Sequence, residues 1–152
     1  MARTTARTAV MQMIYEHIAG GQGGEETLQM VYDQLREEEN PDVRPIEADE
    51  PGQKDRAWIS RVLNGVLERK DELDELIGKA SKGWTVDRMP LVDLTIMRLA
   101  AWEILNEPDE DVPDSVAISE ALTLAEKYSD PAGKSFINGV LGTIAREKEQ
   151  KG

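Results

Sequence analysis

Apolar residues recur at helical spacing along most of the chain, and no stretch alternates apolar and polar residues as a β-strand does. The clearest repeat comprises Ala6, Ala9, Val10, Met13, Ile14 and Ile18. Glycines and prolines separate this repeat from those that follow. The pattern predicts an all-α fold with about six or seven helices.

The expected helices lie at about residues 3–19, 28–35, 59–67, 73–80, 91–106, 118–128 and 131–144. The third and fourth share nearly the same phase, so the repeat leaves open whether the chain breaks near Lys70. Gly83 should stop the fourth helix, and Pro90 and Pro131 suit the starts of later ones. An acidic, proline-containing loop is expected at about 38–52, within a single domain of residues 1–152.

Composition narrows the class of protein. With 39% hydrophobic residues the chain can bury a core, and with no cysteine it has neither disulfides nor thiolate metal sites. The lack of cysteine fits a reducing compartment, so we expect a cytoplasmic protein. No apolar run approaches the roughly 20 residues that span a bilayer, so we expect no membrane association.

The negative charge is concentrated in one segment. The chain carries a net charge of −12, and residues 25–55 hold eleven acidic and three basic residues. Residues 1–24 have a net charge of +1. The overall charge argues against a nucleic-acid-binding protein, but its distribution leaves room for a local basic patch.

Catalytic chemistry has little support. His17 is the only histidine, and the glycines at 20–24 lack the preceding strand and following lysine of a phosphate-binding loop. We therefore predict no catalytic residues, metal site or cofactor, and we expect function to reside in binding surfaces.

Several residues are candidates for those surfaces. Arg3 and Arg7 are four residues apart on one side of the first helix, where they could contact phosphate or simply face solvent. Phe136 lies on or beside an apolar stripe, so it could fill the core or stack on an unpaired base, with Lys134 beside it. Trp58, Trp84 and Trp102 are expected in the core or at its edge.

Several motifs, in this order, resemble the NusB family of transcription antitermination factors. They are Ala6-Arg7 with Ile14-Tyr15, Asn64-Gly65-Val66, the segment from Trp84 to Leu105, Val116-Ala117-Ile118-Ser119-Glu120-Ala121, Leu124-Ala125-Glu126-Lys127-Tyr128, and Phe136-Ile137-Asn138-Gly139-Val140-Leu141. The resemblance extends over most of the chain and implies two small helical bundles packed across each other.

The resemblance also implies partners. Family members bind boxA-type single-stranded RNA together with NusE, a ribosomal protein, and act indirectly on the RNA polymerase elongation complex during ribosomal RNA transcription. Carried over to this chain, the RNA contacts are Arg3, Arg7, Tyr15, Lys134 and Phe136. The NusE contacts are Asp87 and Asp93, whose charge suits a basic partner.

This chain departs from the family at its N-terminus, where Thr4 and Thr5 separate the arginines in place of a denser basic run. Fewer phosphate contacts predict weaker and less salt-sensitive RNA binding. One alternative is a helical protein-binding adaptor on the same scaffold with weak or no RNA binding. Another is the targeting domain of an RNA methyltransferase. The sequence leaves both a monomer and a homodimer open.

Overall fold

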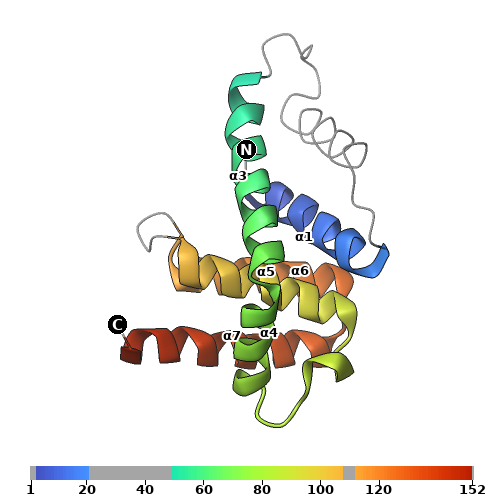
Figure 1. Ribbon diagram of the computed structural model, residues 1–152, viewed down its shortest axis with the longest axis vertical. Coiled ribbons are helices and arrows are strands. Elements are labelled where there is room, and N and C mark those ends of the chain that lie inside the picture. The colour runs from blue at the N-terminus through green and yellow to red at the C-terminus, as the bar shows by residue number, and fades with distance from the viewer. Residues whose placement is uncertain (1–2, 21–48, 108–111, 152) are drawn as a thin grey trace. The chain divides into compact units, whose positions relative to one another are not determined.

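The computed structural model describes residues 3–20, 49–107 and 112–151 (Figure 1). Within these ranges all regular structure is helical, which confirms the predicted fold class. The elements are α1 (Arg3–Gly20), α3 (Asp49–Glu68), α4 (Lys70–Ala80), the 3-10 helix η2 (Val86–Arg88), α5 (Leu91–Asn106), α6 (Asp114–Tyr128) and α7 (Pro131–Lys151). The chain divides into two compact units, Met1–Asn64 and Gly65–Gly152.

Two sequence expectations fall at the edges of the described ranges. The helix expected at about 28–35 and residues 38–48 of the expected acidic loop lie outside them. Residues 49–52, assigned to the end of that loop, instead form the first turn of α3. Pro51 is compatible with this, because the first turn of a helix has no hydrogen-bond acceptor for its N–H groups.

In the first unit, the apolar repeat of α1 is its buried face. The buried members of the repeat are Ala6, Ala9, Val10, Met13 and Ile14. In α3 the buried side chains of this unit are Trp58, Ile59 and Val62. The guanidinium of Arg7 lies over the ring of Trp58, with Cζ 5.4 Å from the centroid. A cation over an aromatic face adds an attraction to the apolar packing of this unit.

Arg69 separates α3 from α4. Its φ of −108° and ψ of 19° leave helical geometry for one residue. The backbone nevertheless keeps its i to i−4 bonds, with Arg69 N–H donating to Gly65 O at 3.1 Å and Leu73 N–H donating to Arg69 O at 2.9 Å. Because only one residue departs, the apolar phase continues across the break, which is why the repeat alone left the question open.

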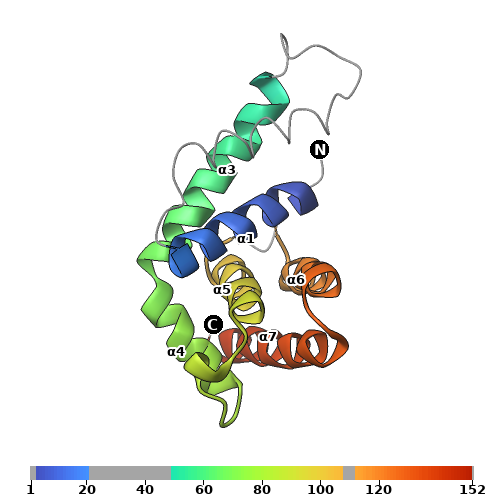
Figure 2. The same cartoon turned by 90° about the vertical axis from the view of Figure 1, so that its right-hand side faces the viewer.

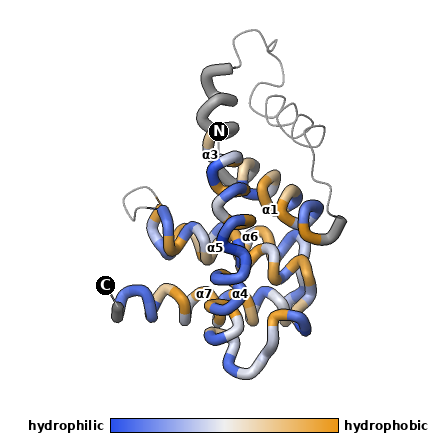
Figure 3. Tube along the Cα trace, viewed as in Figure 1, coloured by the Kyte–Doolittle hydropathy of each residue, from blue (hydrophilic) through white to orange (hydrophobic). Residues whose placement is uncertain are grey.

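The second unit is built around α5. This helix contacts α4, α6 and α7, and its side chains from Asp93 to Ile104 are all buried. Figure 2 shows α5 and α6 side by side, with α7 running beneath them. The tube in Figure 3 shows α7 becoming hydrophilic toward its C-terminal end. A helix that packs against three others is buried on most of its circumference, so most side chains of α5 are apolar. Its buried charged residues are Asp93, Arg98 and Glu103.

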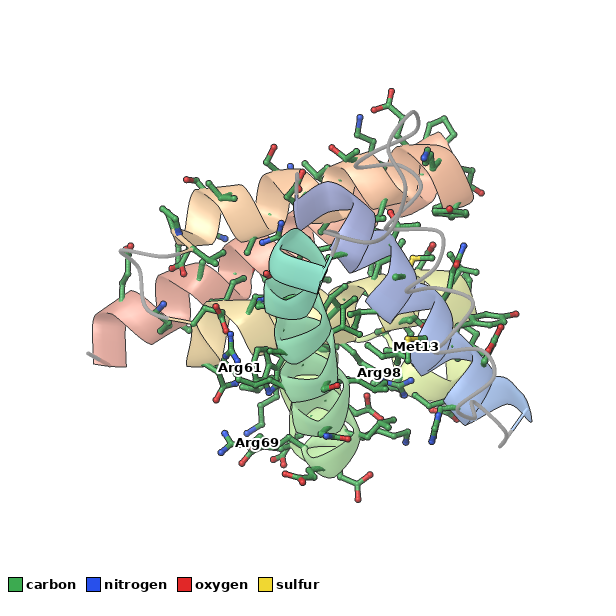
Figure 4. All side chains as sticks on the ribbon, turned by 90° about the horizontal axis from the view of Figure 1, so that it is seen from above. Met13, Arg61, Arg69 and Arg98 are labelled. Atoms are coloured by element: carbon green, nitrogen blue, oxygen red, sulfur yellow. The ribbon has the colours of Figure 1, made fainter. Side chains whose placement is uncertain are left out.

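An ion pair joins α4 to α5 within this core. Arg98 of α5, labelled in Figure 4, donates from Nε to Asp74 Oδ1 at 2.6 Å and from Nη2 to Asp74 Oδ2 at 3.0 Å. Arg98 is 3% exposed, and its Nη1 has no hydrogen-bond partner among the described atoms. The two parallel hydrogen bonds fix the geometry of α4 against α5.

A tight turn carries the chain from α4 to η2. Lys82 and Gly83 both adopt positive φ, +54° and +110°, so Gly83 occupies a backbone conformation that side chains disfavour. Ser81 Oγ lies 2.7 Å from the carbonyl oxygen of Trp84 and 2.8 Å from that of Gly78. The predicted stop at Gly83 is confirmed, and the turn leads directly to Trp84.

Candidate functional site

The corner between α6 and α7 positions two of the predicted RNA contacts. Asp130 begins α7: its Oδ1 accepts a hydrogen bond from Gly133 N–H at 2.7 Å, and Pro131 occupies the first helical position. This cap sets the direction of α7 and therefore the places of Lys134 and Phe136. Lys134 pairs with Glu126 at 3.2 Å in a largely exposed contact, which contributes little to stability and gives way readily to a phosphate.

Phe136 lies at the edge of the core, not inside it. Its ring meets that of Trp84 edge to face, with centroids 6.0 Å apart and an interplanar angle of 69°. Phe136 is half-buried, whereas Trp84 is 54% exposed. The expectation that Trp84 belongs to the core or its edge is therefore wrong, although it holds for Trp58 and Trp102. The pair presents aromatic surface to solvent.

The two predicted partner contacts occupy different environments. Asp87 lies in η2 and is exposed. Asp93 lies in the first turn of α5, is 5% exposed, and accepts a hydrogen bond from Ser129 Oγ at 2.6 Å through Oδ1. This bond joins the start of α5 to the end of α6. Asp87 can meet a partner on an open surface, while Asp93 is mostly buried and lines the pocket beside it.

That pocket opens where η2 and α5 meet the start of α7. It has a volume of about 330 Å³. Its walls combine two aromatic rings, further apolar groups, two carboxylates and one guanidinium. They are formed by Trp84, Arg88, Met89, Pro90, Asp93, Asp130, Ala132, Gly133 and Phe136. This size and mixed lining are typical of small-ligand sites.

The remaining predicted RNA contacts belong to the first unit. Arg3 lies in the first turn of α1, and its side chain is outside the described part of the chain. Arg7 is 3% exposed and packs over Trp58, so its guanidinium has a structural role. Tyr15 is 37% exposed. The five predicted contacts thus fall into two groups, one in each unit.

Sequence reasoning missed most of the pocket. Trp84, Arg88, Met89 and Asp130 gave no local sign of a shared site, and the Asp93–Ser129 hydrogen bond joins residues 36 positions apart. One signal was present: Asp130-Pro131 is a typical start of a helix, and Gly133 follows within the same turn. A side chain at Gly133 would overlap Ser129 Oγ and Asp93 Oδ2, so this glycine allows the corner to close.

Among the described residues, no group of three or more histidines, cysteines, aspartates or glutamates could hold a metal ion. No helix in the described ranges is long and apolar enough to cross a membrane.

Comparison with known proteins identifies similar chains. The NusB family model matches residues 4–146. The transcription antitermination protein NusB of Clostridium botulinum (strain Kyoto) is 36% identical over 144 residues, which cover 95% of this chain and 99% of the relative. That of Acetivibrio thermocellus is 36% identical over 148 residues, covering 97% of this chain and 91% of the relative.

Solved structures agree in fold. T. maritima NusB superposes with a TM-score of 0.73 at 26% identity, covering 99% of this chain and 97% of that one. A crystal structure of antitermination factors NusB and NusE in complex with dsRNA contains a chain that superposes with a TM-score of 0.70 at 19% identity, covering 95% of this chain and 96% of that one. Because the chain in this complex is only 19% identical, its similarity shows a shared fold and nothing more.

Proposed function

This chain belongs to the NusB family of transcription antitermination proteins, which is not a family of enzymes, and we propose that it binds boxA-type single-stranded RNA together with NusE. In this proposal the complex acts in the cytoplasm during ribosomal RNA transcription and reaches RNA polymerase indirectly. The observation that carries the RNA half is the partly exposed aromatic pair of Trp84 and Phe136. Lys134 lies two residues before Phe136 on α7. Unpaired bases stack on such rings, and a nearby ammonium can contact phosphate.

The solved complex of NusB and NusE with dsRNA supports both partners. We propose a single strand for this chain because its aromatic rings can stack only on unpaired bases. Arg3 and Lys134 contact phosphate directly. Arg7, buried beside Trp58, adds positive charge beneath the surface, and Tyr15 contributes an exposed ring on the same helix.

NusE binds at the η2–α5 region in this proposal. Asp87 presents an exposed carboxylate there, and Asp93 lies at the base of the adjacent pocket. A ribosomal protein is basic, so exposed acidic groups favour its association through complementary charge.

A second candidate is a protein-binding adaptor with weak or no RNA binding. The burial of Arg7 favours it, because one of the two N-terminal arginines is engaged in packing. The net charge of −12 favours it as well, because it repels RNA.

Fluorescence anisotropy of a labelled boxA-type RNA, titrated with the protein alone and with NusE at two salt concentrations, separates the two candidates. Salt-sensitive binding that tightens when NusE is added is the expected result. Capture of NusE with no RNA binding under either condition would leave only the adaptor function.

A further inference from the structure

The pocket at the corner between α6 and α7 contains charged groups that the chain leaves without counter-charges. Asp93, Asp130 and Arg88 line it, and none of them belongs to an ion pair within the described part of the chain. The two carboxylates accept hydrogen bonds from neutral groups, the hydroxyl of Ser129 and the backbone N–H of Gly133. Asp93 is only 5% exposed, so it is a buried carboxylate that gains from a positively charged partner.

The balance of charge in the pocket favours a cation. Two carboxylates and one guanidinium leave one negative charge in excess, so a ligand with a single positive charge makes the lining neutral. Arg88 is exposed in η2, so solvent screens its repulsion of a cation. The attraction by the buried Asp93 is screened much less. An anion such as a phosphate meets the opposite balance.

The aromatic rings of the pocket favour a planar cation. Trp84 and Phe136 both line it and meet at 69°, with ring centroids 6.0 Å apart. A guanidinium can lie flat on one ring while its N–H groups reach a carboxylate, whereas an ammonium is compact and more strongly hydrated. The first unit contains the same kind of contact, with the guanidinium of Arg7 over the ring of Trp58. The lining therefore suits an arginine better than a lysine.

We propose that this pocket receives the side chain of one arginine of the protein partner. The inference rests on the proposed function, in which NusE binds at the η2–α5 region, and it names the group that meets Asp93. The volume of about 330 Å³ holds one long side chain. Arginine is enriched among the residues that anchor an interface in a desolvated pocket. Asp87 is exposed and lies outside the lining, so it attracts the partner from the surface.

The arginine and an unpaired base can share the aromatic pair, because each ring has two faces. Trp84 lines the pocket, yet 54% of it is exposed, so surface remains for a base outside the pocket. An arginine in the pocket restrains the rings in one orientation, which lowers the entropy cost of stacking a base on them. Filling of the pocket by NusE therefore favours RNA binding.

The test measures binding of NusE to the full-length protein without RNA, by titration calorimetry. Each arginine of NusE is replaced in turn by alanine and by lysine. We expect one arginine whose replacement by alanine raises the Kd at least about thirtyfold, as truncation of a buried, hydrogen-bonded charge pair does. Lysine at the same position should restore only part of the affinity, because it lacks the planar group.

Asp93→Asn in this chain should raise the Kd to a similar extent. The asparagine carbonyl can still accept the hydrogen bond from Ser129, so the corner should keep its structure, which urea denaturation checks. Combined with the alanine variant of the arginine, Asp93→Asn should cost at least about fivefold less than the product of the two single losses. The matched control is Asp71→Asn, which removes the same charge from a fully exposed aspartate outside the pocket and should weaken binding less than about threefold.

The aromatic contact has its own pair of variants. Trp84→Leu removes the aromatic face, whereas Trp84→Phe keeps one. Because the side chain is largely exposed, both variants should fold normally. Trp84→Leu should bind NusE about two- to fivefold more weakly than Trp84→Phe, the size of a cation over an exposed ring. Equal Kd values for the two would overturn the aromatic contact with the arginine.

Each remaining outcome decides the proposal. NusE binding in which no arginine is coupled to Asp93 would overturn the arginine pocket and leave the proposed function intact. Equal losses from Asp93→Asn and Asp71→Asn would also overturn it. Coupling of Asp93 to a lysine of NusE would overturn the preference for a guanidinium. If the wild-type protein does not bind NusE, the partner half of the proposed function fails together with the pocket.

Discussion

The guanidinium of Arg7 lies over the ring of Trp58 in a position that is 3% exposed. A lysine keeps the charge but loses the planar group that covers the ring. Arg7→Lys should therefore lower the free energy of unfolding by about 1–2 kcal/mol, measured by urea denaturation. Arg146→Lys, an exposed arginine of α7, is the control and should change stability by less than about 0.5 kcal/mol. Equal urea midpoints for the two variants would mean that the stacking of Arg7 on Trp58 contributes nothing to the free energy of unfolding.

Gly133 and Gly139 lie in the same helix but differ in surroundings. A Cβ at Gly133 would overlap Ser129 Oγ and Asp93 Oδ2, whereas a Cβ at Gly139 meets nothing within 4 Å. Gly133→Ala should destabilise by about 1–3 kcal/mol through overpacking, and Gly139→Ala should stabilise by about 0.5–1 kcal/mol through helix propensity. Thermal unfolding of both variants measures the difference. If both variants raised the Tm, the corner between α6 and α7 would have to relax freely around the added methyl group at residue 133.

At the scale of the elements, the Asp74–Arg98 ion pair joins α4 and α5. Arg98 is almost fully buried and Asp74 is mostly so. Asp74→Asn leaves the guanidinium without its counter-charge and should cost about 3 kcal/mol, measured by urea denaturation. The exposed Asp71→Asn, three residues earlier on α4, should leave stability unchanged.

Replacing both members of this ion pair tests whether its charges or its apolar packing stabilise the contact between α4 and α5. Asp74→Leu combined with Arg98→Met removes both charges and keeps apolar volume, so it should be more stable than either single variant. A double variant less stable than both would show that the geometry of the two hydrogen bonds matters more than the removal of buried charge.

Periodicity predicted the helices but not the site, for physical reasons. It located the ends of α5 and α6 at Asn106 and Tyr128, because burial in a helical bundle follows the helical repeat. The stop at Gly83 was predicted, but the exposure of Trp84 was not, because the local pattern does not show how much of a side chain tertiary packing covers. It could not reveal the contact of Asp93 with Ser129, because tertiary packing between distant residues leaves no local pattern.

At the scale of the whole molecule, net charge and few phosphate contacts act together on RNA binding. Each contact with single-stranded RNA contributes about −0.7 to the slope of log K against log salt. Direct contacts by Arg3 and Lys134 alone predict a slope of about −1.4. Added salt also screens the repulsion between RNA and a protein of net charge −12. The observed slope should therefore be shallow, between zero and about −1.4.

Anisotropy titrations over a range of salt concentrations measure this slope. Arg3→Ala with Lys134→Ala should weaken binding and flatten the slope toward zero, because the phosphate contacts that release counterions are gone. Glu126→Gln is the informative companion: it frees Lys134 from its ion pair, so it should strengthen binding without altering the number of contacts or the slope. A wild-type slope steeper than about −4 would require about six phosphate contacts, and basic side chains other than these two would then carry most of the RNA binding.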